Sequence, residues 1–418
     1  KELAAKLMAE GKAYPCFCTE EELEQKRLQA EAEGKDTKYD GTWRDADPAE
    51  VKAKIDAGEP YTVRFKVPKN KYFAIDDVVR SDVGWDAEAT VGDFILLRSN
   101  GIPVYNFCVA VDDALMGVTT VIRAEEHLTN TLRQGLILEA LGYPIPRYAH
   151  LSLVLGEDRS KLSKRHGATS LDQFRTEGFL PEAMMNYLSL LGWNDGTDKE
   201  IFSPQELIEG FSLERITKSP AIFDMTKLRW VNAQHLRQLP QATLSTMLRA
   251  RLEESGVCVA GADGAQADSF FAMVTELAAE RIETVNDVDG LVKGVLAYRL
   301  ADTIASGEAA KIVDDGFGDL AAEVVASFER GEMPRGDETD FGDAWKAWTK
   351  QLGAATGRKG KQLFMPLRLA LTGALSGVDV GSTVQLLSLA DGVASEVTPM
   401  AARMRELKEM KLPAAAAA

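Results

Sequence analysis

The 418-residue sequence contains little cysteine, no long apolar run and no excess of positive charge. Its four cysteines are too few to stabilise a chain of this length by disulfide cross-links. This excludes a disulfide-rich secreted scaffold and favours a reducing compartment. No run of about 18 apolar residues occurs, so we expect no membrane-spanning helix. The formal net charge of −16 argues against a general nucleic-acid coat, although basic residues could still gather on one face.

The sequence also lacks an initiator methionine, and its start does not resemble a signal peptide. Residues 1–11 instead have the pattern of a helix that Gly11 closes, so we expect the chain to begin inside a domain. Hydrophobic residues make up 45% of the chain and charged residues 27%, which is typical of a globular protein. The length predicts about three domains.

The first part of the chain has the pattern of a small α/β module, which we place at residues 1–103. Residues 19–34 are charged and helix-forming. Residues 61–67 alternate between apolar and polar side chains as a half-buried strand does, and residues 94–98 predict a second strand.

Strands and helices then alternate between residues 104 and 167, which is the layout of a parallel sheet. We expect strands at 104–111, 119–123 and 149–155, and a helix at 129–141. Ligands of such sheets bind beyond the carboxyl ends of the strands. A binding site is therefore expected where these strands end in polar residues.

The remaining sequence predicts helices almost throughout, in two parts at residues 168–240 and 241–414. Ser170 and Gln173 fit a capping box at a helix start, and Pro181 fits the first turn of the next helix.

Two lysines flank a serine in the loop of residues 161–167, which follows an apolar strand and a polar turn. Lys161 and Lys164 are mobile point charges suited to phosphate, and Ser163 can help to hold the loop in shape. The pattern alone is short and common, and a solvated surface turn is its more usual explanation. The surrounding segments decide between an ATP-phosphate loop and a surface turn.

Several of these segments resemble class I aminoacyl-tRNA synthetases, and in particular the bacterial-type glutamyl-tRNA synthetases. The strand and loop of residues 148–170 are similar to the second signature of that class. Four further segments agree in order and spacing: 101–106, 111–113, 116–128 and 223–232. The similarity is strong over about residues 1–240 and weaker through the stretch 366–373.

The resemblance implies the fold class α/β plus all-α. Part of a Rossmann-type nucleotide-binding fold, at residues 104–167, would carry the inserted α/β module that binds the tRNA acceptor end. A helical stem-contact region at 168–240 and an all-helical anticodon-binding region at 241–414 would follow.

The resemblance also implies a two-step reaction. ATP, with Mg²⁺, activates L-glutamate to glutamyl-adenylate, and the glutamyl group then passes to the 3′ end of tRNA(Glu); charging of tRNA(Gln) stays open. Lys161 and Lys164 would stabilise the phosphorus centre and the departing pyrophosphate. Ser163, Glu126 and His127 would contact the ATP, although a packed histidine at a helix start explains His127 as well.

Glutamate selection requires a cation for the side-chain carboxylate, and the resemblance assigns this role to Arg123. Its planar fork of N–H donors suits a carboxylate, whereas a structural ion pair with Asp112 or Asp113 is the alternative. Tyr105 would lie beside the amino acid. Val109 stands where some relatives have a polar glutamate contact, so part of that pocket is expected to differ.

The first signature of class I enzymes, His-x-Gly-His, is absent from the sequence. We expect it to lie upstream of Lys1, so that the 418-residue chain alone should not activate glutamate. If the gene itself lacks that signature, the alternative is a pseudo-synthetase that binds tRNA or a partner without chemistry. Another adenylyl-forming ligase is disfavoured by the Arg123 segment and the helical region.

Cys16 and Cys18 suggest a zinc site, which some relatives complete with further ligands. Tyr39 is present, but Trp43 stands where the last cysteine would be. Two thiolates and a phenol make a poor tetrahedral site, so we expect no zinc.

A basic stretch in the helical region contains Lys359, Lys361 and Arg368, which we expect to contact the anticodon stem of tRNA. A solvated helix face is an equal alternative.

The partners that the resemblance implies are tRNA(Glu), L-glutamate and ATP. No membrane partner is expected, and the protein is expected to be a monomer. Its expected location is the bacterial cytoplasm or an organellar matrix or stroma.

Overall fold

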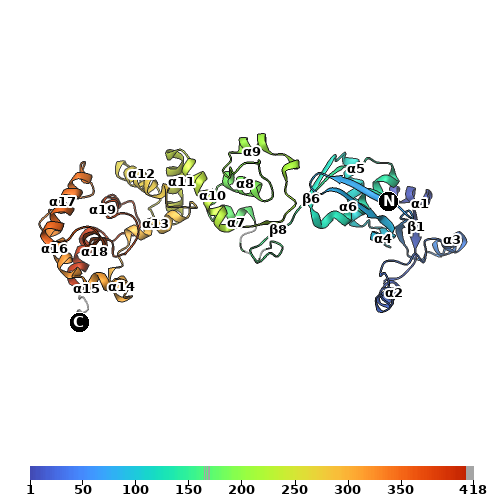
Figure 1. The fold of residues 1–418 in the computed structure, drawn as a ribbon, viewed down its shortest axis with the longest axis horizontal. Helices are drawn as coiled ribbons and strands as arrows, with labels where there is room; N and C mark the ends of the chain where they lie inside the picture. Colours follow the sequence, from blue (N-terminus) through green and yellow to red (C-terminus); the bar gives the residue numbers. More distant parts are fainter. Residues whose placement is uncertain (164, 166, 168–169, 411–418) are drawn as a thin grey trace. The chain divides into compact units, whose positions relative to one another are not determined.

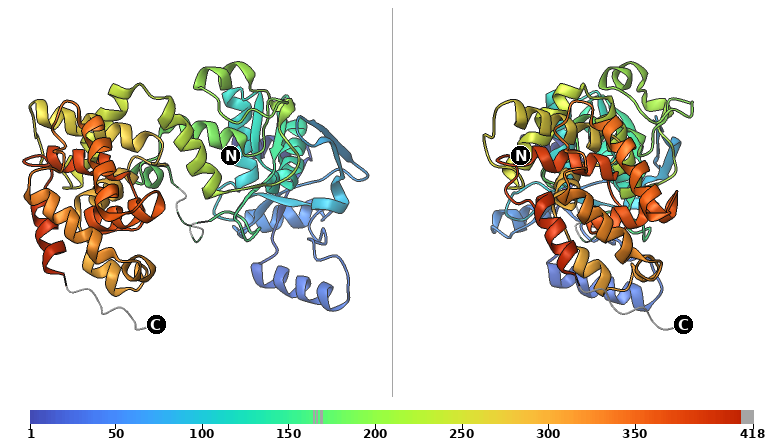
Figure 2. Two further views of the ribbon diagram at one scale, coloured as in Figure 1. Left: turned by 60° about the vertical axis from the view of Figure 1, so that its left-hand side comes forward. Right: turned by 90° about the vertical axis from the view of Figure 1, so that its left-hand side faces the viewer.

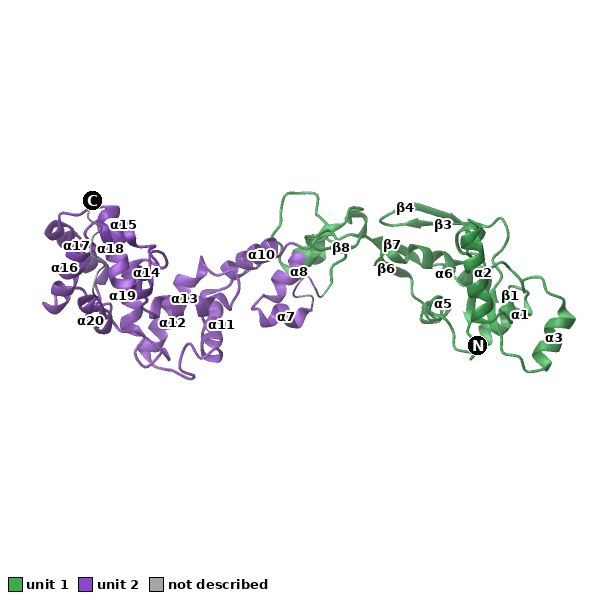
Figure 3. Ribbon diagram, turned by 90° about the horizontal axis from the view of Figure 1, so that it is seen from below, with its two compact units in different colours: residues 1–163, 188–223 green, residues 164–187, 224–418 purple. Residues whose placement is uncertain are grey.

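The chain divides into two compact units, which are described separately (Figure 3). Unit 1 comprises residues 1–163 and 188–223, and unit 2 comprises residues 164–187 and 224–418. The computed structural model describes the following residues: 1–163, 165, 167 and 170–410. Among these residues, no helix is both long and apolar enough to cross a bilayer.

Unit 1 contains a four-stranded sheet with the strand order β4–β3–β7–β6 (Figure 1). Its strands are β3 (Tyr72–Asp77), β4 (Ser81–Asp86), β6 (Thr120–Ala124) and β7 (Arg147–Leu151). β3 and β4 form an antiparallel hairpin, whereas β7 runs parallel to both β3 and β6. The parallel pairing predicted for the strands near residues 119–123 and 149–155 is therefore confirmed.

The strand predicted at 149–155 is divided in the structure. β7 ends at Leu151, and the chain continues as β8 (Val154–Leu155), which pairs in parallel with β9 (Ala221–Ile222) in a separate sheet. The chain thus leaves the four-stranded sheet just before the loop that contains Lys161.

A three-stranded antiparallel sheet with the order β1–β2–β5 forms the other part of unit 1. Its strands are β1 (Ala13–Cys16), β2 (Thr62–Phe65) and β5 (Phe94–Leu97), and the nearby helices are α1 (Glu2–Ala9), α2 (Glu20–Ala32), α3 (Pro48–Asp56) and α4 (Ala87–Val91). The strands predicted at 61–67 and 94–98 are confirmed. α2 buries none of its residues and projects from the sheet in Figure 2.

The strand predicted at residues 104–111 is wrong, because this segment forms helix α5 (Tyr105–Met116). Gly117 closes the helix with a left-handed φ of 69°. The apolar residues that suggested a strand recur at helical spacing: Val104, Phe107, Val111 and Ala114. Asp112 and Asp113 consequently lie within a helix and not at the end of a strand.

α5 lies beside α6 (Leu128–Leu141), which packs on the four-stranded sheet. Gly135 of α6 faces Phe73 of β3, and a Cβ at Gly135 would lie 2.1 Å from the Phe73 ring. Only glycine permits this approach of helix to sheet. The close packing holds α6, and with it Thr131, against the strands that carry the candidate site.

Unit 2 is helical. Its helices are α7 (Leu171–Thr176), α10 (Met225–Gln238), α11 (Gln241–Glu254), α12 (Ala265–Ala279), α13 (Asp287–Leu296), α14 (Leu300–Ala305), α15 (Ala310–Asp314), α16 (Phe317–Glu329), α17 (Phe341–Thr356), α18 (Lys361–Thr372), α19 (Val380–Leu389) and α20 (Met400–Glu409). α8 (Pro181–Leu190) spans the two units, and α9 (Pro204–Gly210) belongs to unit 1. The capping box of Ser170 and Gln173 and the helix starting at Pro181 are confirmed.

Arg403 of α20 is fully buried and joins three helix ends of unit 2. Among the residues that the structure describes, its guanidinium donates to backbone carbonyls alone: those of Val295, Leu296, Ala297, Leu371 and Thr398, at 2.8–3.0 Å. Several of these carbonyls lie at the C-terminal ends of α13 and α18, which carry partial negative charge. The carbonyl of Leu296 also accepts from the backbone N–H of Thr398, so the arginine is needed chiefly by the other carbonyls at these helix ends.

We predict that Arg403→Met lowers the free energy of unfolding by about 3 kcal/mol or more, because it leaves several buried carbonyls unsatisfied. Urea unfolding followed by circular dichroism measures this. Arg405→Met, at an exposed position of the same helix, is the matched control and should change stability by less than about 0.5 kcal/mol. Equal effects of the two substitutions would contradict the role assigned to Arg403.

Candidate active site

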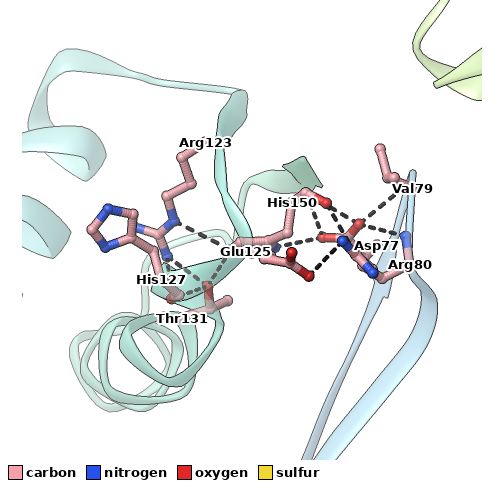
Figure 4. Close-up of polar contacts among 8 residues, drawn as sticks. All are labelled: Asp77, Val79, Arg80, Arg123, Glu125, His127, Thr131 and His150. Atoms are coloured by element: carbon pink, nitrogen blue, oxygen red, sulfur yellow. Dashed lines mark hydrogen bonds and ion pairs between the residues drawn. The ribbon is translucent and has the colours of Figure 1, made fainter. Parts of the chain in front are cut away.

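The candidate site of unit 1 lies at the carboxyl ends of three neighbouring strands. Asp77 ends β3, Arg123 lies at the end of β6, and His150 lies opposite Arg123 in the register of β7 (Figure 4). A short 3-10 helix, η1 (Glu125–His127), follows β6 and leads into α6. Parallel pairing thus gathers polar side chains at one edge of the sheet, where ligands of such sheets bind.

Neutral groups hold the guanidinium of Arg123. Its Nε donates to Nε2 of His150 at 3.2 Å. Its Nη2 donates to Oγ1 of Thr131 at 2.5 Å and lies 3.4 Å from the carbonyl oxygen of His127. The arginine is half-buried, and desolvation lowers its pKa.

No described carboxylate forms an ion pair with Arg123. The alternative of a structural ion pair with Asp112 or Asp113 is therefore not observed in this part of the chain. Because an arginine keeps its charge at neutral pH, Arg123 presents a cation without a countercharge in direct contact.

His150 is itself held by a buried carboxylate. Nδ1 of His150 lies 2.6 Å from Oδ2 of Asp77, and neither side chain is exposed. Burial would raise the pKa of Asp77, but hydrogen bonds from the backbone of Arg80, from His150 and from Val79 together lower it. Desolvation lowers the pKa of His150 against the opposing effect of Asp77. The pair is thus a carboxylate and a neutral imidazole at neutral pH.

Arg80 connects this pair to the segment after β6. Its guanidinium forms a 2.5 Å ion pair with Glu125 and donates to Oγ of Ser152 at 2.7 Å and to the carbonyl of His150 at 3.3 Å. The position of η1 is therefore tied to the end of β7.

Sequence reasoning missed Asp77, Arg80, Thr131 and His150. One signal for Asp77 was present, because Phe73, Ile75 and Asp77 share the buried face of β3. A carboxylate in a row of buried apolar side chains indicates a specific partner. The partner could not be identified, because His150 lies 73 residues away in the sequence.

The predicted ATP residues Lys161 and Glu126 meet in the structure. Nζ of Lys161 lies 2.9 Å and 3.0 Å from the two carboxylate oxygens of Glu126, and this hydrogen bond lowers the pKa of Glu126. Both side chains are exposed. Ser163 is also exposed, whereas Lys164 lies outside the described residues.

Tyr105 and His127 lie at helix starts. Tyr105 is the first residue of α5 and is 58% exposed, and its hydroxyl forms no hydrogen bond with a described residue. Val109 follows one helical turn later on the same side of α5. Nδ1 of His127 lies 3.1 Å from Nδ2, the side-chain amide nitrogen, of Asn130.

Cys16, Cys18 and Tyr39 do not fit a zinc site. The Tyr39 hydroxyl accepts a 2.8 Å hydrogen bond from the backbone of Trp43 and a 3.5 Å one from Cys16, and Arg64 stacks 3.9 Å from its ring. Across the described residues, no group of three or more His, Cys, Asp or Glu side chains could hold a metal ion.

The structure separates the three basic residues predicted to bind tRNA. Lys359 lines a pocket with Lys346, Lys350, Arg358 and Phe364. Arg368 lines a second pocket, with Lys293 and Arg299, and donates to the carbonyl of Val378 at 2.8 Å. Lys361 is the first residue of α18. The basic stretch thus contributes to two pockets of unit 2.

Two family descriptions match this chain. Residues 1–230 match "tRNA synthetases class I (E and Q), catalytic domain", and residues 243–390 match "Anticodon binding domain". The chain belongs to the class I tRNA synthetases of the E and Q group. Both the family resemblance and the combination of a nucleotide-binding fold with a helical region are therefore confirmed.

Named relatives of this synthetase agree with that assignment. The glutamate–tRNA ligase of Carboxydothermus hydrogenoformans is 41% identical over 388 residues, which cover 93% of this chain and 79% of the relative. The glutamate–tRNA ligase of Aquifex aeolicus is 39% identical over 389 residues, with the same shares covered. A crystal structure of a glutamate tRNA ligase from Elizabethkingia meningosepticum, in complex with its amino acid, has a TM-score of 0.80 at 27% identity and covers 98% of this chain and 83% of that chain.

We predict that the synthetase loses stability as the pH falls below about 6.5, the ordinary pKa of histidine. Because the folded-state pKa of His150 is lowered, the unfolded chain binds a proton there first, and acidification favours unfolding. Asp77, whose pKa is also lowered, stays charged until about pH 4 or below, so its contribution is constant in this range.

Urea unfolding at about pH 7.5 and about pH 5.5 measures this effect. The midpoint should fall more for the unsubstituted synthetase than for His150→Gln, which cannot titrate. His235, whose pKa burial also lowers, is common to both proteins and cancels in the comparison. Equal falls in the two proteins would show that His150 does not titrate as stated.

Proposed function

We propose that the protein is a glutamate–tRNA ligase that joins L-glutamate to the 3′ end of tRNA(Glu) at the expense of ATP. The observation that carries this proposal is Arg123, a half-buried cation held by neutral groups at the carboxyl end of a parallel strand. Such a cation suits the side-chain carboxylate of glutamate, with Tyr105 beside the amino acid. The glutamate–tRNA ligases similar to the chain support the same substrate.

The chemistry needs positioned charges and no nucleophile on the enzyme. In the first step, the α-carboxylate of glutamate attacks the α-phosphorus of ATP, and pyrophosphate leaves. In the second step, a terminal ribose hydroxyl of tRNA attacks the activated carbonyl, and AMP leaves. Lys161 and Lys164 would stabilise the negative charge that moves onto the phosphates, with Mg²⁺ as the counter-ion that accompanies ATP.

The contact between Lys161 and Glu126 suits a loop that exchanges partners. An exposed ion pair is worth about 1 kcal/mol or less, so the phosphates of ATP can compete for Lys161. Glu126 would then contact the nucleotide or the amino end of glutamate. His127 would lie beside the adenine, and Ser163 would support the loop.

Unit 2 would bind tRNA through its two basic pockets. The protein carries a net charge of −16, so any phosphate contact must come from local groups of lysine and arginine. Lys359, Lys361 and Arg368 stay our candidates for the anticodon stem, in a region that matches the anticodon-binding family description.

We keep the division into an acceptor-binding module (1–103), a nucleotide-binding part (104–167), a stem-contact region (168–240) and an anticodon-binding region (241–414). We also propose a monomer. The named relatives come from bacteria, which favours the bacterial cytoplasm over an organelle. A pseudo-synthetase without chemistry is not favoured, because the relatives are ligases.

Arg123→Gln in the full-length protein should lower kcat/KM for glutamate by about 100-fold or more, because the side-chain carboxylate loses its charged partner. Glutamate-dependent ATP–pyrophosphate exchange measures this value, and the KM for ATP should stay within about twofold of the starting value. Arg147→Gln, at the opposite end of β7, is the control and should leave exchange unchanged. Unaltered glutamate kinetics in Arg123→Gln would refute the assignment.

Replacing Lys359, Lys361 and Arg368 by alanine should weaken tRNA binding and reduce its salt dependence. Each lost phosphate contact lowers the slope of log K against log salt by about 0.7–0.9. Filter binding of tRNA(Glu) over a range of salt concentrations measures both quantities. The triple variant Lys311→Ala, Arg405→Ala and Lys408→Ala removes the same number of positive charges at exposed positions of unit 2 and controls for net charge. An unchanged slope in the first triple variant would place the RNA contact elsewhere.

A further inference from the structure

We propose that Asp77 and His150 are positioning residues that keep Arg123 available for the side-chain carboxylate of glutamate, by fixing the imidazole proton on Nδ1. The proposal rests on the function proposed above and extends it to two buried residues of unit 1. Figure 4 shows the chain of contacts from Asp77 through His150 to Arg123.

The position of the proton follows from the acceptors. A carboxylate only accepts hydrogen bonds, so the 2.6 Å contact between Oδ2 of Asp77 and Nδ1 of His150 requires the proton to be on Nδ1. The neutral imidazole then has a lone pair on Nε2. This lone pair faces Nε–H of Arg123 at 3.2 Å, which is a donor under all conditions, and the Thr131 hydroxyl, whose Oγ1 lies 2.9 Å from the same Nε2, can donate to it as well. The reverse tautomer would set two N–H groups against each other.

Backbone donors fix Asp77 in this orientation. Its Oδ1 accepts from the backbone N–H of Val79 at 3.0 Å and of Arg80 at 2.8 Å, and the backbone N–H of His150 lies 3.2 Å and 3.1 Å from its two oxygens. These donors cannot rotate away. Oδ1 therefore accepts from the turn after β3, and Oδ2 accepts from the imidazole.

A neutral partner serves Arg123 better than a carboxylate would. A carboxylate in direct contact would neutralise the guanidinium and compete with the substrate. With the imidazole between them, the negative charge of Asp77 balances the site at a distance. His150 thus orients Arg123 without taking its charge.

The donors of Arg123 divide accordingly. Nε is used by His150, and Nη2 is used by Thr131, with the carbonyl of His127 at 3.4 Å. Nη1 donates to no residue in the part of the chain that the structure describes. Its two N–H groups are the donors we assign to the glutamate carboxylate.

Asp77→Asn in the full-length protein tests the tautomer directly. The amide oxygen should take the place of Oδ1, because the fixed N–H groups of Val79 and Arg80 require an acceptor there. The amide NH₂ then faces Nδ1 of His150 and donates to it. The imidazole proton moves to Nε2, which then donates to Oγ1 of Thr131 and no longer accepts from Nε–H of Arg123, so the guanidinium is displaced.

The expected result is a rise in the KM for glutamate of about 10- to 100-fold, the effect of losing a hydrogen bond to a charged group. In glutamate-dependent ATP–pyrophosphate exchange, the KM for ATP should stay within about twofold. Asp76→Asn is the matched control, because Asp76 is the exposed neighbour on the same strand. A merely structural role would instead lower the thermal midpoint and impair the KM for ATP and for glutamate together, and that outcome would overturn the proposal.

Thr131→Val supplies a second test that does not depend on the folding of Asp77→Asn. Valine keeps the shape of threonine in α6 but removes both the acceptor of Nη2 and the hydroxyl 2.9 Å from Nε2 of His150, so the KM for glutamate should rise here also, with the KM for ATP unaffected. If Asp77→Asn leaves the KM for glutamate unchanged while the starting protein is active, the positioning role of Asp77 and His150 is wrong, whatever the result for Thr131→Val. If the starting full-length protein shows no glutamate-dependent exchange, the proposed function itself is wrong.

Discussion

The buried hydrogen bond between Asp77 and His150 is the contact on which the site of unit 1 depends. It joins the end of β3 to the end of β7, and through the imidazole it reaches Arg123 on β6. Because a buried carboxylate is costly without partners, the backbone donors of the turn after β3 are needed as well. The pairing of the strands and the orientation of Arg123 are thus parts of one arrangement.

Arg403 and Arg123 differ in burial and in how many of their N–H donors are already hydrogen-bonded, and this difference distinguishes a structural arginine from one that could bind a ligand. Arg403 is fully buried, and carbonyls accept from all three of its nitrogens, so a ligand cannot reach it. Arg123 is only half-buried, and its Nη1 is not used by any residue that the structure describes. Both avoid carboxylates, but only Arg123 has donors available to a substrate.

The sequence predicted the features that depend on local pattern. The strands near residues 61–67 and 119–123, the capping box at Ser170 and the placement of Arg123 at a strand end required no knowledge of distant contacts. The strand prediction for 104–111 is wrong because a short apolar run fits a strand and one face of a helix equally well; the helix ends at Gly117, which is in the αL conformation. Asp77 and His150 were missed because their role exists only once strands 73 residues apart are paired.

The most direct measurement of the central claim is the protonation state of His150. Nuclear magnetic resonance of protein with isotope-labelled histidine distinguishes a protonated from an unprotonated ring nitrogen, and the loss of a signal in His150→Gln assigns it. We predict a neutral imidazole near pH 7.5, with the proton on Nδ1 and a lone pair on Nε2. A proton on Nε2, or on both nitrogens, would contradict the account, because Nε2 could then not accept from Arg123.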